Sequence, residues 1–339
     1  MEANHDTRFT HKDFTSLCVG FSGLSAVFHD ECPAKFKKQK NFRQLNDEIL
    51  NTNFARKPIK THQFTAVCKK IIKGQRRVIK KANYIMSLFP KRFISPLGYI
   101  DLANNCGEFK KNRGYILRAL SKNEEEFPIA FDINIYKDIE QFERLLRAIY
   151  RPQNHYCIHV DKKSPRTFHR AVEKISSCFS NVFVASQMIE VTWGEFSVLQ
   201  STLLCMKDLW ERSNTWKYFI NLSGQEFPMK TNNELVAILQ RLKGKSIVRG
   251  QRPKESKIRR RFLYVYHAGK RTEMLKEPFR QNFTFYKGST YVVLSRAFVD
   301  FILHDKLARD FLEWVKDTRI PDETYYPTLY RNLDFDKSE

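Results

Sequence analysis

The sequence lacks several short motifs that identify large classes of protein. Neither a G-x-G-x-x-G segment nor a P-loop sequence occurs, which excludes the dinucleotide fingerprint and the phosphate loop of NTPases. The absence of H-E-x-x-H and of G-x-S-x-G excludes the zincin and α/β-hydrolase signatures. The seven cysteines form no C-x-x-C pair, so zinc-finger spacing is also missing. The best apolar stretch, Leu17 to Phe28, is 12 residues long, whereas a membrane span needs about 20.

Glycine is scarce, whereas phenylalanine and positive charge are abundant. The 339 residues include 12 Gly and 28 Phe, and 42% are apolar, which excludes collagen-like repeats and wholesale disorder. The formal charge is +22, a field that attracts polyanions. Residues 1–120 carry 23 Lys/Arg against 9 Asp/Glu, and the remainder carries 36 against 28. We therefore predict a basic, weakly structured segment at 1–60, a stem region at 61–127 and a folded domain at 128–339.

Strand and helix patterns alternate from Pro128 onward. Apolar runs of strand length lie at 129–135, 156–160, 182–185, 218–222 and 289–294. Helical patterns lie at 138–150, 164–179, 194–210, 235–242 and 296–303. We expect N-caps at Ser164 and Ser295 and a capping box from Thr231 to Glu234. This alternation predicts an α/β fold with a mainly parallel sheet, helices on both faces and a ligand at the carboxyl ends of the strands.

Acidic residues stand at positions where such a sheet binds ligands. Asp161 follows the strand at 156–160 and could hydrogen-bond a ribose hydroxyl, or it could cap the next helix. Asp322 and Glu323 follow a proline and open a predicted helix. One of these carboxylates could be a general base for a substrate hydroxyl, or both could complement the helix dipole. Ser223 to Glu226 follow another strand at the same edge.

A basic run extends from Lys254 to Arg261, and Lys270, Arg271 and Lys276 follow it. The run lies in a long insertion without strong periodicity. It could hold a phosphate or an anionic acceptor, or it could be a solvated charged surface. Because no nucleic-acid-binding module accompanies these residues, we expect no nucleic-acid partner.

Two histidines and two glycosylation sequons complete the candidates. His155 and His159 lie four residues apart on one strand face, where we interpret them as structural residues rather than metal ligands. The sequon at Asn221 lies in a predicted buried strand and is expected to be unused. The sequon at Asn282 lies in the loop-rich insertion and is plausible for a secreted chain.

Six segments together resemble the core-2/I-branching β1,6-N-acetylglucosaminyltransferase family, whose members branch mucin-type O-glycans. They include YCIHVDKKS, NLSGQEFPMKTN and DTRIPDETYYPTL, and they cover residues 131–164, 175–187, 203–210, 218–236, 287–299 and 317–329. The similarity extends from about Phe64 to Leu329 and is weakest near 250–285. The resemblance implies a GT-A-type fold with a Rossmann-like half that binds a nucleotide sugar.

The resemblance also implies an inverting transfer of a sugar, GlcNAc in the first instance, from a UDP-sugar to an O-glycan in β1,6 linkage. Glu323 matches the glutamate of the family's PDE motif, which deprotonates the acceptor hydroxyl. Asp161 matches an aspartate that helps to hold the uridine. Gly224 and Glu226 lie in a loop that is close to the donor in relatives.

Further implications concern the acceptor, the metal and the leaving group. Lys254 and Lys257 stand where the family places basic contacts to the acceptor. The family works without a metal, so we expect no cofactor besides the donor. In relatives, basic residues well beyond the PDE motif stabilise the leaving diphosphate. Because 16 residues follow Glu323 here, we expect that basic clamp to be missing from this chain.

The cysteines allow either scattered buried thiols or disulfides on residue patterns alone. The resemblance implies the pairs Cys106–Cys178 and Cys157–Cys205, and it leaves Cys68 unpaired. It further implies a Golgi lumenal domain on a type II membrane protein, although no anchor is visible in the sequence.

Three hypotheses of different classes follow. The first is a Golgi glycosyltransferase that acts on glycoprotein O-glycans. The second is a catalytically silent accessory or glycan-binding chain, because the diphosphate clamp is expected to be missing. The third is a polyanion-binding protein, which the charge of +22 suggests.

Overall fold

The computed structural model describes residues 70–333 except 72, 89–92 and 254–255, and the chain forms two compact units, Met1–Arg92 and Phe93–Glu339. The described part of the first unit contains helix α4 (Arg76–Leu88). The other elements belong to the second unit. Residues 93–127 there share a hydrophobic core with the central sheet. The predicted boundaries at 60 and 127 remain predictions.

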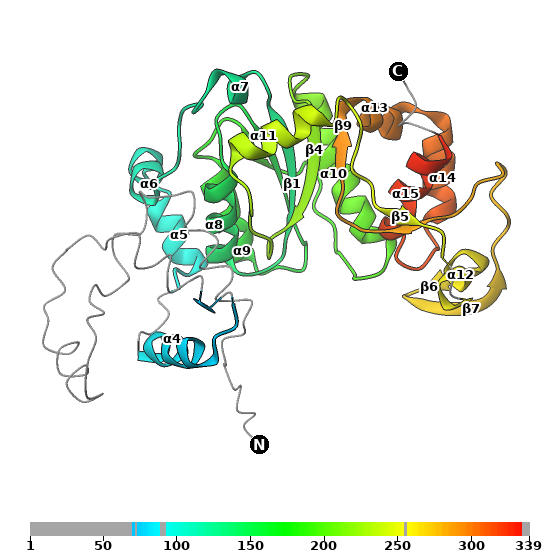
Figure 1. Cartoon of the computed structure of the whole chain (residues 1–339), viewed down its shortest axis with the longest axis horizontal. Coiled ribbons are helices and arrows are strands. Elements are labelled where there is room, and N and C mark those ends of the chain that lie inside the picture. The colour runs from blue at the N-terminus through cyan, green and yellow to red at the C-terminus, as the bar shows by residue number, and fades with distance from the viewer. Residues whose placement is uncertain (1–69, 72, 89–92, 254–255, 334–339) are drawn as a thin grey trace, which may run out of the picture. The chain divides into compact units, whose positions relative to one another are not determined.

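A five-stranded sheet forms the centre of the second unit (Figure 1). β1 lies in the middle and pairs in parallel with β2 and β4, and β2 pairs in parallel with β3. β9 pairs antiparallel with β4 at the edge. The prediction of a mainly parallel α/β sheet is therefore confirmed. The strands in spatial order are β3 (Val182–Val184), β2 (His155–Val160), β1 (Ile129–Ile135), β4 (Tyr218–Ser223) and β9 (Val293–Ser295).

Helices cover both faces of the sheet, as predicted (Figure 1). Alternate residues of β1 contribute to two different cores: Phe131 and Ile133 to one, Ala130 to the other. Because both faces of the sheet are buried, β1 is mostly apolar, and its polar residues are Asp132 and Asn134. The first face is covered by α5 (Pro96–Leu102), α6 (Cys106–Arg113), α8 (Ile139–Ile149), α9 (Arg166–Ser176) and α11 (Asn232–Arg241). The second is covered by α10 (Phe196–Arg212), α13 (Arg296–His304), α14 (Lys306–Val315) and α15 (Asp322–Asn332).

Smaller elements surround this sandwich. They are α7 (Lys122–Glu125), β5 (Gly250–Gln251), α12 (Ser256–Leu263), β6 (Tyr264–His267), β7 (Lys270–Leu275) and β8 (Lys287–Gly288). β5 pairs with β8, and β6 pairs with β7 as a hairpin. Within the described residues, no helix has the length and apolar character required to cross a bilayer.

Local sequence signals predicted most helix starts correctly. Thr231 and Glu234 form the predicted capping box of α11, and the Ser295 hydroxyl caps α13. The N-cap predicted at Ser164 is wrong, because this hydroxyl donates to the Tyr136 carbonyl at 2.8 Å. Helix α9 instead begins after Pro165 without a side-chain cap.

Within the described residues, two disulfides stabilise the second unit, and both were implied by the family resemblance. Cys106–Cys178 links the start of α6 to the residues after α9. Cys157–Cys205 links β2 to α10, across the interface between the sheet and the second layer of helices. Cys18, Cys32 and Cys68 lie outside the described residues.

We expect the replacement of Cys157 and Cys205 by alanine to lower the free energy of unfolding by about 2 to 5 kcal/mol, because the denatured chain loses a covalent constraint. Both residues are fully buried, and the disulfide closes a loop with a sequence separation of 48. Guanidinium unfolding curves would measure the loss. Reductant should move the midpoint of the unmodified chain toward that of the variant. Equal midpoints without reductant would contradict the expectation.

Candidate functional site

Two segments that the sequence singled out lie together at the carboxyl end of β1. The Asp161 amide, directly after β2, donates to the Ile135 carbonyl at 2.9 Å. The Gly224 amide, directly after β4, donates to the Asn134 carbonyl at 2.9 Å. Because β2 and β4 flank β1 on opposite sides, this is the point at which the strand order switches. Parallel sheets bind their ligands at such a position.

The loop after β4 requires a glycine and holds a partly buried carboxyl group. A Cβ on Gly224 would lie 2.7 Å from Ile135 Cγ2, which is too close for any larger residue without movement of the neighbouring side chain. The Glu226 carboxylate accepts from the Ser223 amide at 2.5 Å and closes the turn. Burial raises the pKa of Glu226, and its hydrogen bonds with Ser223 and Tyr291 oppose this.

Asp161 closes a tight turn and does not cap the next helix. Its Oδ1 accepts from the Lys163 amide at 2.9 Å, and its Oδ2 lies 3.2 Å from Lys163 Nζ. Helix α9 begins only at Arg166, so the helix-cap alternative is wrong. The role of Asp161 in holding a uridine stays a prediction.

The side chain of Asn221 fixes the segment that follows β8. Its amide nitrogen donates to the Thr290 carbonyl at 2.8 Å, and its amide oxygen accepts from the Val292 amide at 2.8 Å. These bonds explain why the strand predicted at 289–294 begins only at Val293 as β9: the preceding backbone groups already pair with a side chain. Tyr291 is thereby held with its hydroxyl 3.4 Å from Ser223 Oγ.

Glu323 lies in the first turn of α15 and is ion-paired with two cations. Arg261, in the last turn of α12, donates to its carboxylate at 2.9 Å. Lys287 Nζ of β8 lies 3.6 Å from the same oxygen. The Glu323 side chain remains 24% exposed, so a substrate can still reach it. Arg261 belongs to the basic run from Lys254 to Arg261, whereas Lys287 lies outside that run and was not predicted as a site residue.

Asp322, next to Glu323, is buried, and burial raises its pKa to about 6. The negative charge of Glu323 also raises this pKa, whereas the Thr290 side chain and Arg261 lower it. Burial likewise raises the pKa of Tyr291, and the charges of Glu226 and Asp322 both add to the effect. Tyr291 therefore lies within electrostatic range of the loop after β4 and of the start of α15.

Trp193 is a candidate site residue that the sequence analysis did not single out. It is 78% exposed, although its loop is held on both sides. On one side, Lys162 donates its amide to the Ile189 carbonyl at 3.0 Å. On the other, the Ile320 amide donates to the Gly194 carbonyl at 2.9 Å, immediately before α15. An exposed tryptophan between the Asp161 turn and the helix that carries Glu323 is suited to stack on a flat ligand. The tryptophan-glycine pair after a strand was the available signal.

A buried polar layer lies where α10 and α15 cover the sheet. Asn134 on β1 donates to Asp132 at 2.8 Å and to Thr202 on α10 at 3.4 Å. Asp132 and Tyr326 are essentially inaccessible to solvent, and burial raises the pKa of both well above their usual values. Among the described residues, Asp132 Oδ1, Asp322 Oδ1 and the Tyr326 hydroxyl have no hydrogen-bond partner within the protein. Such a layer is suited to buried water.

Several predicted residues lie outside this cluster. Lys254 is not among the described residues, and Lys257 belongs to α12 without a described side chain. His159 is buried, accepts from the Ile189 amide at 3.2 Å, and has a pKa that burial lowers to about 4, as a structural histidine does. Asn282 is exposed in its loop. The described residues contain no group of three or more His, Cys, Asp or Glu side chains that could hold a metal ion.

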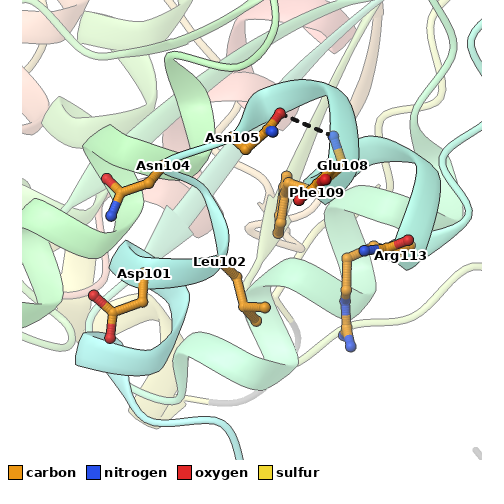
Figure 2. Close-up of a pocket in the computed structure, with 8 residues that line it drawn as sticks. Asp101, Leu102, Asn104, Asn105, Glu108, Phe109 and Arg113 are labelled. Carbon is orange, nitrogen blue, oxygen red and sulfur yellow. Dashed lines mark hydrogen bonds between the residues drawn. The ribbon is translucent and has the colours of Figure 1, made fainter.

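A separate hollow of about 320 Å³ lies on α5 and α6 (Figure 2). Two of its polar side chains already have structural partners: Asn105 accepts from the Glu108 amide as the cap of α6, and Arg113 pairs with the buried Glu143. No residue that the sequence singled out lines this hollow. Its lining residues are Asp101, Leu102, Asn104, Asn105, Glu108, Phe109, Asn112 and Arg113.

Comparisons with known proteins identify the family to which the chain is similar. Residues 129–339 match the Core-2/I-Branching enzyme family. The chain is 43% identical over 270 residues to a β-1,3-galactosyl-O-glycosyl-glycoprotein β-1,6-N-acetylglucosaminyltransferase of bovine herpesvirus 4 strain DN-599, covering 78% of this chain and 61% of that protein. It is 40% identical over 285 residues to the human enzyme 3 of that name, covering 82% and 64%. It is 44% identical over 236 residues to the Bos taurus enzyme 3, covering 69% and 53%.

The chain thus spans 53 to 64% of the length of these relatives. The family match covers the whole sheet, the loop after β4 and the helix that carries Glu323. With the mainly parallel sheet and its two helical layers, it confirms the GT-A-type fold that the resemblance implied. The chain belongs to the Core-2/I-Branching enzyme family.

Proposed function

We propose that this chain carries the catalytic domain of an inverting β1,6-N-acetylglucosaminyltransferase that acts on glycoprotein O-glycans. The observation that carries the proposal is the partly exposed, ion-paired carboxylate of Glu323. Its neighbour Asp322 lies within electrostatic range of Tyr291, which contacts the loop after β4. The printed names of the viral, human and bovine relatives support this choice of reaction.

In the proposed reaction, Glu323 is the general base. It accepts the proton of an acceptor hydroxyl while that oxygen bonds to the anomeric carbon of the donor. The bond between this carbon and the diphosphate oxygen breaks, and its electron pair leaves with UDP. A single displacement inverts the anomeric configuration. Arg261 and Lys287 hold the carboxylate in place before the acceptor binds.

The donor is proposed to lie between the Asp161 turn, the Gly224 loop and Trp193. Proximity to the strand ends supports this placement, as does the requirement for a glycine at 224. We propose UDP-GlcNAc as the donor and no metal or other cofactor. The two disulfides support a Golgi lumenal location, since disulfides persist in oxidising compartments.

Calorimetric titration with UDP and UDP-GlcNAc in EDTA, followed by a transfer assay, tests the proposal. The acceptor would be an O-glycan core disaccharide with β1,3-linked galactose. Saturable binding in EDTA and formation of a β1,6-linked product are the expected results. Binding without turnover would instead indicate a glycan-binding or accessory chain. If the chain binds neither UDP nor UDP-GlcNAc, the proposed placement of the donor is refuted.

We expect Trp193→Ala to weaken UDP binding roughly five- to hundredfold, because base–aromatic stacking contributes about 1 to 3 kcal/mol. The exposed side chain makes little contribution to the core, so the melting temperature should remain the same. Trp193→Phe retains a ring and should keep most of the affinity. An unchanged dissociation constant for Trp193→Ala would remove this residue from the donor site.

A further inference from the structure

The β6–β7 hairpin is held firmly against α14 although it projects from the body of the unit (Figure 1). Lys276, just after β7, donates to the Trp314 carbonyl at 2.8 Å, pairs with Asp317 and lies over the Trp314 ring. The Tyr266 amide donates to the Asp317 carbonyl at 2.8 Å. At the tip, Ala268 and Gly269 both have positive φ, as a tight two-residue hairpin turn requires.

The hairpin presents aromatic, aliphatic and cationic side chains to solvent. Tyr264 pairs with Leu275 across the strands, and the Arg271 guanidinium lies 4.7 Å from the centre of the Tyr264 ring. Leu275 is 68% exposed, and Leu263 and Met274 are exposed by more than half. Tyrosine and arginine are the residue types enriched at protein-binding hot spots. We call Leu263, Tyr264, Arg271 and Leu275 the hairpin patch.

The net charge around the hairpin patch is positive. Residues 256–277 contain seven Lys/Arg and two Glu. Arg261 and Lys276 pair with acidic groups of the body, whereas Lys270 and Arg271 are exposed on the hairpin. An occupant of complementary charge is therefore acidic.

The hairpin patch is close along the chain to the proposed active site. Arg261 contacts Glu323, and Tyr264 follows it by three residues, a chain distance of at most about 11 Å. A hydroxyl placed at Glu323 on a short O-linked glycan brings its carrier polypeptide close to α12 and the hairpin. The carrier is thus the macromolecule best placed to occupy the patch.

We infer that the hairpin patch is an exosite that binds acidic polypeptide next to the glycosylated residue of the acceptor. This inference rests on the proposed function and refines it. It divides acceptor recognition into a sugar site near Glu323 and a peptide site on the hairpin. The peptide site selects among glycoproteins that carry the same glycan.

Three acceptors carrying one disaccharide test the exosite: the free glycoside, a neutral glycopeptide and a glycopeptide rich in Asp and Glu. The variants are Arg271→Glu and Leu275→Asp, both on exposed side chains. Leu97→Asp, at a 57% exposed position on α5, is the matched control. We expect kcat/KM for the acidic glycopeptide to fall about tenfold through KM, equivalent to about 1.4 kcal/mol. The free glycoside should react equally with every variant.

Fluorescence anisotropy with labelled glycopeptides gives a readout that does not depend on turnover. A chain that binds the acidic glycopeptide through the patch but transfers no sugar would refute the proposed function and retain the exosite. Equal affinity of the unmodified chain for acidic and neutral glycopeptides would overturn the exosite. The exosite would also be overturned if the patch variants lost as much kcat/KM with the free glycoside as with the acidic glycopeptide. Arg271-dependent binding to phosphatidylserine vesicles, without discrimination among glycopeptides, would overturn it in favour of a membrane surface.

Discussion

Glu323→Gln is expected to slow sugar transfer by about 10²- to 10⁴-fold, the usual contribution of a general base. The amide keeps the size of the side chain but cannot take a proton from the acceptor hydroxyl. UDP affinity should remain the same, because the proposed donor contacts belong to other segments. The loss should therefore appear in kcat rather than in donor binding, as single-turnover kinetics would show.

Glu211→Gln is a suitable control for this variant. Its side chain is 59% exposed and its ion-pair partner among the described residues is Lys207 on the same helix, so transfer should be unaffected. Thermal unfolding of both variants would verify that they fold, since Glu323→Gln leaves Arg261 without its anion. Full transfer by folded Glu323→Gln chain would rule out the assigned base.

Asp322→Asn is expected to stabilise the protein at neutral pH. Burial raises the pKa of Asp322 from 3.8 to about 6 in the folded state. The folded state thus binds the proton more tightly than the unfolded state, so stability falls as pH rises between these two values. The full difference corresponds to about 3 kcal/mol above pH 6. The variant avoids this loss because its amide never ionises.

Urea unfolding at pH 4.5 and pH 7.5 would measure this effect. The stability gap between variant and unmodified chain should grow from about 1 to about 3 kcal/mol over that interval. Asp310→Asn, on an exposed side chain of α14, should change little at either pH. A gap that stays constant with pH would show that Asp322 is not the titrating group. The presence of a destabilising carboxyl beside Glu323 is typical of a functional site.

The sheet was predictable from sequence because its interior strands are apolar on both faces. The runs at 129–135 and 218–222 are mostly apolar, with Asp132, Asn134 and Asn221 as their polar members, and correspond closely to β1 and β4. The edge strand β9 was predicted too early, because the Asn221 side chain takes the hydrogen bonds that a neighbouring strand would otherwise take. Ser164 failed as a cap for a similar reason, since a distant carbonyl competes for its hydroxyl.

The sequence predicted the positions of those site residues that directly follow strands of the parallel sheet. Asp161 and Gly224 directly follow strands, so the parallel sheet brings them to one edge. The contact between Arg261 and Glu323 joins residues 62 positions apart and depends on how α12 docks beside α15. The position of the Trp193 loop is fixed by backbone hydrogen bonds at Ile189 and Gly194, and this position leaves the Trp193 side chain exposed to solvent. Such bonds leave no periodic pattern in a sequence.

Asn221 belongs to a glycosylation sequon, yet both ends of its amide hold the backbone at Thr290 and Val292. The residue is only 6% exposed. A sugar would replace one of the two N–H groups of this buried amide and would need space that the fold has filled. The glycan and the folded sheet therefore exclude one another. In a glycosylating compartment, a glycan could be attached to Asn221 only before the chain folds. Chains that carry it could then not reach the native state.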